Sequence, residues 1–221
     1  MRSFFVSLLD ITHMPFSNFK SLGATVKELQ VIYNEANFVS QAVFPVSEYF
    51  QQDLEYVMRE GVFNNSEFAI CENLIYPILK EVWKAYSSKF TLWSHQMLTC
   101  DDVLSGYPEY VLARRSPLGK IVFDKPYLLI VEAKQDNFDW GWGQCLAEMV
   151  AAQRLNEESA IAIFGIVSNG INWEFGKLEG NRFTHHPAPS TIFELKSLFA
   201  MVNYLFQQSE IQLSMYQEMA A

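Results

Sequence analysis

The chain of 221 residues has little cysteine and no long apolar run. Its three cysteines, Cys71, Cys100 and Cys145, are widely spaced and odd in number, which argues against a disulfide framework and against a cysteine-based zinc site. No apolar stretch approaches the ~20 residues that a membrane-spanning helix needs. Asp10 interrupts the N-terminal apolar patch before it reaches the length of a signal-peptide core. We therefore expect a cytoplasmic protein with reduced thiols and no membrane association.

Basic residues are also scarce. The sequence has 16 Lys and Arg against 25 Asp and Glu, a net charge of −9, and its pI is near 4.9. The only local group of bases is Arg114, Arg115, Lys120 and Lys125, and adjacent arginines on a strand point to opposite faces, so at most one of them faces any one site. Proteins that bind nucleic acid tightly without sequence preference usually have a basic surface. Strong DNA binding is therefore expected only with metal ions, a partner or a larger assembly.

Several catalytic signatures are missing as well. The sequence contains no P-loop, no GxGxxG and no serine or cysteine triad signature. His185 and His186 are adjacent and precede Pro187, so we expect a loop here rather than a metal site, for which helix-spaced histidines are the better-supported motif. Trp140 and Trp142 could stack on bases, but packing of a helix start onto the sheet is the favoured interpretation.

Half of the residues are apolar and 15% are aromatic, so the chain can form a sizeable core, and we expect a single domain over residues 1–221. Apolar spacing and helix start signals predict helices over residues 24–39, 46–60, 66–86, 140–156 and 192–206. Apolar or alternating segments predict strands within residues 89–98, 108–115, 127–134, 159–167 and 171–179. The order of helix, three strands, helix, two strands and helix predicts a mixed α/β sheet with helices on its faces.

Two of these helices carry capping signals. Ser47 is the expected N-cap of the helix over residues 46–60, with Glu48 in its first turn. Thr191, with Glu194 three residues later, is spaced as a capping box for the C-terminal helix. In the helix over residues 66–86, Pro77 is expected to cause a kink.

An acidic residue lies in line with the apolar face of this kinked helix. At 100° per residue, Glu72 falls on the side of Ile75, Leu79 and Trp83. On geometry alone, the favoured interpretation is an acid at the edge of the face near the helix start, where a carboxylate suits the helix dipole. Glu109, which starts a strand directly after "SGYP", is on its own most simply a strand-end acid in solvent.

The strand "YLLIVEAK" ends with an acid and a base. Glu132 and Lys134 are two residues apart, so their side chains share one face of the strand. One interpretation is an exposed ion pair, which contributes little to stability. However, the pair follows five apolar residues directly, and charged side chains are rarely buried unless they are paired or bind a ligand. This favours a functional role for the pair.

The segments "GYPEYVLAR" and "YLLIVEAK", followed by Gln144, together resemble the PD-(D/E)XK nuclease superfamily. Its pattern is Pro-Asp, a variable gap and Glu-x-Lys, often with a Gln on the next helix and an acid on the preceding one. The pattern maps to Pro108-Glu109, Glu132-Ala133-Lys134, Gln144 and Glu72. The segments "NSEFAICENLIYPILKEV" and "GWGQCLAEMVAAQ" look particularly like an uncharacterised cyanobacterial group in that superfamily. The resemblance covers about residues 65–180. It departs from the pattern at Glu109, because Asp is usual there and Glu adds a methylene.

The resemblance implies a metal-dependent site for phosphodiester hydrolysis. A divalent cation polarises the phosphate and lowers the pKa of a bound water, and Mg²⁺ prefers hard oxygen ligands. Glu109 and Glu132 would be direct ligands of Mg²⁺ or Mn²⁺, Glu72 a ligand or a support through water, and the Ala133 carbonyl a further ligand. Lys134 would hold the attacking water or the phosphate oxygens. Gln144 would orient Lys134 or the water.

The resulting expectation is a restriction-endonuclease-like core at residues 63–182, a helical N-terminal extension at 1–62 and a C-terminal helical segment at 183–221. The expected function is that of a Mg²⁺-dependent endonuclease acting on DNA. One alternative is a catalytically inactive protein of the same fold that serves as a binding or assembly module. Another is a generic α/β protein whose charged strand end is only a salt bridge. Homodimers are common where both DNA strands are cut, although the residues show no interface.

Overall fold

The computed structural model describes residues 15–219, so the N-terminal segment with Asp10 lies outside the described residues. Its helical segments are η1 Pro15–Asn18, α1 Leu22–Glu28, α2 Glu48–Glu60, α3 Glu67–Ile70, η2 Cys71–Ile75, α4 Tyr76–Tyr86, α5 Phe138–Asn156, η3 Ile192–Glu194 and α6 Leu195–Met219. Its strands are β1 Ile32–Glu35, β2 Phe90–Ser94, β3 Leu98–Thr99, β4 Ser105–Gly106, β5 Tyr110–Arg115, β6 Phe123–Ala133, β7 Ile163–Ser168, β8 Asn172–Glu179, β9 Arg182–His185 and β10 Ser190–Thr191.

A mixed sheet of eight strands forms the centre of the molecule. Its order is β1-β9-β8-β7-β6-β5-β2, with β10 paired to β8. Strands β6 and β7 are parallel, and β5 is antiparallel to β6. Helix α5 is the crossover between the two parallel strands, as a parallel pair requires. The short strands β3 and β4 form a separate hairpin.

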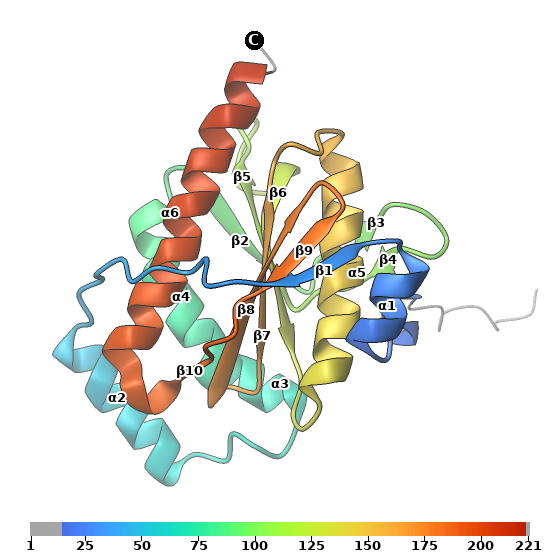
Figure 1. The fold of residues 1–221 in the computed structure, drawn as a ribbon. Helices are drawn as coiled ribbons and strands as arrows, with labels where there is room; N and C mark the ends of the chain where they lie inside the picture. The colour runs from blue at the N-terminus through green and yellow to red at the C-terminus, as the bar shows by residue number, and fades with distance from the viewer. Residues whose placement is uncertain (1–14, 220–221) are drawn as a thin grey trace, which may run out of the picture.

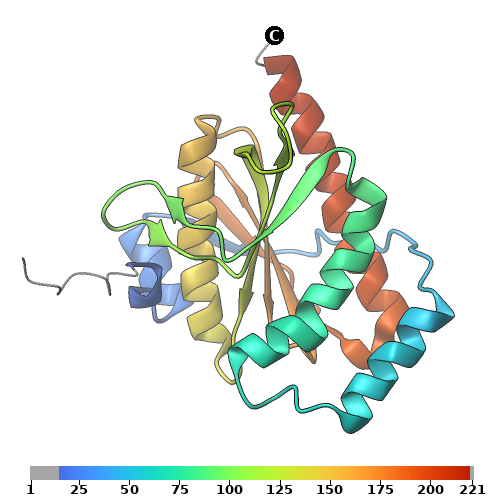
Figure 2. The ribbon, with the colours of Figure 1, turned by 180° about the vertical axis from the view of Figure 1, so that it is seen from behind.

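Helices cover both faces of this sheet, which gives three layers (Figures 1 and 2). Helices α2, α4 and α6 lie on one face, over a core that includes Phe50, Leu79 and Phe206. Helices α5 and α1 lie on the other face, over a core that includes Leu146 and Phe183. Within residues 15–219, no helix is both long enough and apolar enough to cross a membrane.

The predicted mixed α/β sheet with flanking helices is confirmed. The five predicted strand segments contain all of β2, β5 and β8 and most of β6 and β7, and the predicted helix over residues 140–156 corresponds to α5. Ser47 caps α2 as expected, because its side chain accepts a hydrogen bond from the Phe50 amide at 3.2 Å.

The helix predicted over residues 24–39 is wrong in its second half. Helix α1 ends at Glu28, Gln30 adopts a left-handed conformation with φ of 56°, and β1 follows. The β-branched pair Val31-Ile32 suits a strand better than a helix. Strand β1 pairs in parallel with β9. The N-terminal segment therefore adds a strand to the sheet as well as helices.

Two further details at the C-terminal side differ from the sequence prediction. The loop expected at His185 and His186 begins one residue later, because His185 is the last residue of β9, whereas His186 and Pro187 lie outside any strand. Thr191 precedes the single turn η3 and makes no side-chain cap hydrogen bond, so no capping box forms.

The helix predicted over residues 66–86 is present as three consecutive pieces. Ser66 caps α3, and the π-helical turn η2 leads into α4, which carries Pro77 in its first turn. Proline lacks an amide donor and clashes with the preceding turn of a regular α-helix. A change of helix type directly before Pro77 relieves both problems.

Candidate active site

Two acidic side chains lie close together where the central strands β5 and β6 meet at one end of the sheet. Tyr110 of β5 lies opposite Val131 of β6, and continuing this antiparallel register by one residue places Glu109 opposite Glu132. Directly opposed residues point to the same face. Both carboxylates therefore face the α5 side of the sheet.

A cavity of about 480 Å³ opens at this point, and we call it the site cavity. Its lining residues are Ser17, Glu67, Tyr107, Glu109, Glu132, Lys134, Gln135, Asp136, Asn137, Trp140 and Gln144. Four of the predicted site residues are among them. The structure therefore gathers Glu109, Glu132, Lys134 and Gln144 around one space.

Lys134 is the central cation of this cavity. Its ammonium lies 3.1 Å from Glu132 Oε1 and 3.4 Å from Glu67 Oε2. The side chain is 11% exposed and that of Glu132 is 2% exposed. The exposed-pair interpretation of this strand end is therefore wrong, because both charges are largely removed from solvent. The Lys134 ammonium also lies 5.7 Å from the centre of the Trp140 ring, which forms part of the cavity wall.

The start of α5 approaches this strand end closely. Asn137 caps the helix by accepting a hydrogen bond from the Trp140 amide at 3.0 Å. A Cβ at Gly141 would lie 2.6 Å from Val167 Cγ1 and 3.0 Å from Lys134 Cγ. Only glycine therefore allows this approach without displacement. One turn later, Gln144 reaches the cavity.

The site gathers several acids around one lysine, and this shifts the pKa values of Glu132 and Lys134. The pKa of Glu132 is raised well above its usual range, first by burial and then by the nearby charges of Glu148 and Glu109. A hydrogen bond with Glu109 raises it further. Burial alone would lower the pKa of Lys134, but Glu132 and Glu67 outweigh it and raise that pKa. The ammonium is therefore charged at neutral pH, and one positive group faces several acids.

Glu148 belongs to this cluster, although the sequence analysis did not select it. It is 1% exposed, and burial and the charge of Glu109 raise its pKa well above the usual range. It lies four residues after Gln144, so the two share one face of α5. This four-residue spacing from Gln144 was the sequence signal that could have identified Glu148. However, Glu148 lies in the apolar segment "CLAEMVAA", where a single acid can also be explained as a residue that faces solvent.

The structure places Glu72 elsewhere. Glu72 lies in η2, on the α4 face of the sheet, and lines a different cavity with Tyr76 and Tyr110. Tyr110 faces this side because it alternates with Glu109 along the strand. The helical acid beside Lys134 is Glu67, in the first turn of α3. Helical spacing located the helix but not which of its acids turns toward the strand end.

Two buried carboxylate oxygens of this cluster make no hydrogen bond to the protein. Glu109 Oε2 and Glu148 Oε2 are buried and make no hydrogen bond. Such atoms are costly unless a ligand or ion satisfies them. Within residues 15–219, no group of three His, Cys, Asp or Glu side chains is arranged as a metal cage. A site with two protein carboxylates is nevertheless typical of Mg²⁺, which keeps several waters. Ala133 is fully buried in the pairing of β6 with β7.

Other residues considered from the sequence lie outside the site cavity. Trp142 is buried and packs on Phe183, as expected for a packing role. His185 contacts Glu174 at 3.2 Å. His186 Nδ1 accepts a hydrogen bond from the Val39 amide at 3.4 Å. Neither histidine lines the site cavity.

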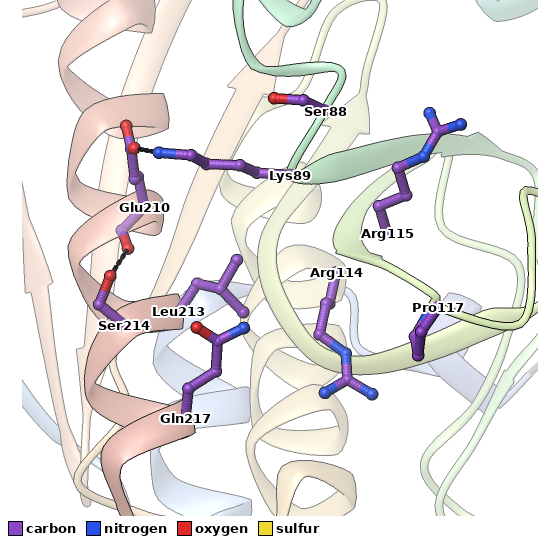
Figure 3. Close-up of a pocket in the computed structure, with 9 residues that line it drawn as sticks. All are labelled: Ser88, Lys89, Arg114, Arg115, Pro117, Glu210, Leu213, Ser214 and Gln217. Carbon is purple, nitrogen blue, oxygen red and sulfur yellow. Dashed lines mark hydrogen bonds and ion pairs between the residues drawn. The ribbon is translucent and has the colours of Figure 1, made fainter.

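The two arginines line a cavity at the opposite end of β5 (Figure 3). Arg114 pairs with Asp124 at 2.5 Å, and Arg115 donates to the Ser87 carbonyl at 3.0 Å. Lys89 pairs with Glu210 on the other wall. The two guanidinium groups point apart in Figure 3, so this cavity does not present a convergent set of cations.

No protein-family model matches the chain, and a search of curated proteins found no match. Among solved structures, the chain is similar to one described as the type IIG restriction endonuclease BpuSI, with 15% identity and a TM-score of 0.36. The alignment covers 72% of this chain but only 18% of that chain, so the present sequence spans less than a fifth of the length of that protein.

Proposed function

We propose that the chain is a metal-dependent nuclease with a restriction-endonuclease-like fold, and that it hydrolyses phosphodiester bonds in DNA. The observation that carries this proposal is the convergence of Glu109, Glu132 and Lys134 on one cavity at the end of a central sheet. The strand order around the site and the crossover helix α5 agree with the fold that the sequence motifs imply.

Glu109 and Glu132 would hold the cation, which in this proposal is Mg²⁺ or Mn²⁺. When bound, such an ion would polarise the phosphate and lower the pKa of a water molecule that it holds. Glu109 directly precedes β5 and Glu132 lies opposite it on β6, and this fits the role, because a cation relieves the repulsion between two close carboxylates. Glu148 is a further buried acid that interacts with Glu109.

Lys134 would bind the phosphate and the attacking water. Its raised pKa keeps it protonated at neutral pH, so it serves as a fixed positive charge and hydrogen-bond donor for phosphate oxygens. Glu67 and Glu132 hold the ammonium from two sides. The Gln144 side chain has both a donor and an acceptor, and from α5 it would orient the water or the lysine.

Nicking of supercoiled plasmid DNA with Mg²⁺ or Mn²⁺ tests this assignment. We expect Glu132→Ala and Lys134→Ala each to lower the rate by about 10²-fold or more, the size of effect seen when one charge-stabilising group is removed. Glu179→Ala and Lys177→Ala are matched controls, because this acid and base pair with each other on β8 at 2.8 Å. Activity that survives both site substitutions rejects the assignment.

A non-catalytic binding module with the same fold is the second candidate. The observation that favours it is Glu109, whose longer side chain stands where the motif usually has Asp. Titration calorimetry with Mg²⁺ and Mn²⁺ separates the two candidates. Metal binding that Glu132→Gln removes supports the nuclease, and absence of metal binding at millimolar metal supports the module.

A further inference from the structure

A second cavity, of about 200 Å³, opens at the same end of the sheet but on the α4 side of β5. We call it the aromatic cavity, and its walls include Phe68, Glu72, Tyr76, Ser94, His95 and Tyr110. It is smaller than the roughly 300–1,000 Å³ of pockets for drug-sized ligands. Its size therefore suits one flat ring system rather than a larger molecule.

Four aromatic rings shape this cavity. Tyr76 and Tyr110 stack with centroids 5.7 Å apart and planes at 19°. His95 meets Tyr110 edge-on at 6.2 Å, and Phe68 lies 5.9 Å from His95. Phe68 is 68% exposed. A large apolar ring left open at the mouth of an aromatic cavity is suited to stacking on a planar ligand.

The polar groups of the cavity include Glu72 and Ser94. The Glu72 side chain is exposed, and an ionised carboxylate can only accept hydrogen bonds. Ser94 Oγ contacts His95 Nδ1 at 2.8 Å, which fixes the orientation of that ring. A planar ligand that donates from an exocyclic amino group would match the aromatic walls and the carboxylate together.

Adjacent residues of the chain line the site cavity and the aromatic cavity. Glu67 lines the site cavity and the next residue, Phe68, lines the aromatic cavity. In the same way, Glu109 lines the site cavity and Tyr110 lines the aromatic cavity. The backbone amide of His95 donates to the Glu109 carbonyl at 2.9 Å. The two cavities therefore lie at the same end of β5, on its two faces.

Resting on the proposed nuclease function, we propose that the aromatic cavity binds one unpaired nucleobase of the substrate and favours bases with an exocyclic amino group. A paired base is stacked and its hydrogen-bonding edge is occupied, so it must leave the duplex to enter. The substrate class is thus a single strand, or a duplex with an unpaired base near the cleaved bond. Glu72 acts here in base selection instead of metal binding.

Fluorescence anisotropy with labelled 12-nucleotide strands tests this without any need for cleavage. The parent protein carries Glu109→Gln and Glu132→Gln, which removes the proposed metal ligands and part of the charge that repels phosphate. We expect oligo-dC to bind more tightly than oligo-dT, because thymine presents carbonyl oxygens where cytosine presents its amino group. Adding Phe68→Ala should weaken oligo-dC binding by roughly tenfold, as loss of one stacked base does.

Glu72→Gln should bring the affinities for oligo-dC and oligo-dT close together, because the amide can also donate. Tyr56→Ala and Glu55→Gln are matched controls, since both residues are exposed on α2 away from the cavity. Three results would each overturn the proposed base-binding site. One is an equal effect of Phe68→Ala and Tyr56→Ala, and another is an unchanged base preference in Glu72→Gln. The third is no binding of the labelled DNA strands up to about 0.1 mM protein. Plasmid nicking by the unmodified protein is scored separately, so a failed base site and a failed nuclease assignment give different results.

Discussion

Glu132 follows five apolar residues on a central strand, and its carboxylate is 2% exposed. Its partners are one ammonium, from Lys134, and two further acids, Glu109 and Glu148. Burial of like charges destabilises a folded protein unless a cation or protons compensate for it. Perturbed acids of this kind cluster at functional sites, and this is the physical reason why the proposed function is placed here.

Glu148→Gln is predicted to stabilise the metal-free protein at neutral pH. Burial and Glu109 raise the pKa of Glu148 in the folded state, so the folded protein holds this proton more tightly than the unfolded chain does. The free energy of unfolding then falls as pH rises above the ordinary value of about 4.3 for Glu. In EDTA at pH 7 to 8, we expect a gain of about 1 kcal/mol, seen as a Tm about 2–4 °C higher.

The same variant should show a flatter dependence of Tm on pH, measured by thermal denaturation between pH 5 and 8. Glu179→Gln is the control, because Glu179 is exposed and pairs with Lys177. A loss of stability in Glu148→Gln, or an unchanged pH dependence, contradicts the description of Glu148 as a buried acid under repulsion.

At this scale, the sequence predicted most of the site but not all of it. Glu132 and Lys134 were predictable because two-residue spacing on an apolar strand fixes their common face. Glu109 was predictable from its motif, although its pairing with Glu132 depends on sheet register. The choice of Glu67 over Glu72 depends on where α3 begins and on the π-helical turn, and neither follows from a regular 100° repeat.

Helix α5 is held against the sheet by small residues. Besides Gly141, a Cβ at Gly165 on β7 would lie 2.6 Å from Met149 Sδ of α5. On another side of α5, a Cβ at Gly143 would lie 2.6 Å from the Phe19 carbonyl oxygen, so this glycine allows the N-terminal segment to approach the helix. Glycine lowers helix stability by roughly 0.5–1 kcal/mol relative to alanine. Its use here sets the close distance between α5 and the strand ends that carry the site.

Gly141→Ala is predicted to lower both stability and nicking activity. The new Cβ would meet Val167 and Lys134, and overpacking of this kind costs about 1–3 kcal/mol, more than the gain in helix propensity. Lys134 should shift, so we expect at least a tenfold loss of nicking rate in protein that remains folded by circular dichroism.

Gly23→Ala is the matched control within a helix. Nothing lies within 4 Å of a Cβ at Gly23 in α1, so the alanine should stabilise the protein by about 0.5–1 kcal/mol and leave activity unchanged. If both variants behave alike in thermal denaturation and nicking, the close approach at Gly141 does not position the lysine.

Element types were predictable where the pattern was long and regular, and they failed where short strands join the sheet. β6, β7 and α5 have clear apolar patterns, and their predicted types are confirmed. β1 and β9 are four residues each and pair with one another in parallel. Such strands depend on a partner far away in the sequence, so local propensity carries little information about them.

The whole molecule is acidic, and this bears on the proposed action on DNA. Its net charge is −9, and the arginines at the far end of β5 are engaged with Asp124 and the Ser87 carbonyl. The site end carries four acids, Glu67, Glu109, Glu132 and Glu148, around one lysine. A phosphate backbone is repelled by this end until cations occupy it.

DNA binding is therefore predicted to require divalent metal. The Lys134→Met variant keeps the carboxylates and is expected not to cleave, so it allows equilibrium binding to be measured by anisotropy on a labelled duplex with an unpaired cytosine. In EDTA we expect dissociation constants weaker than about 10⁻⁴ M, the weak limit of non-specific binding, and at least tenfold tighter binding in millimolar Mg²⁺. Adding Glu132→Gln should remove most of this metal response, whereas Glu179→Gln should keep it. Tight binding in EDTA, or a metal response that survives Glu132→Gln, would show that the DNA is held by another surface of the molecule.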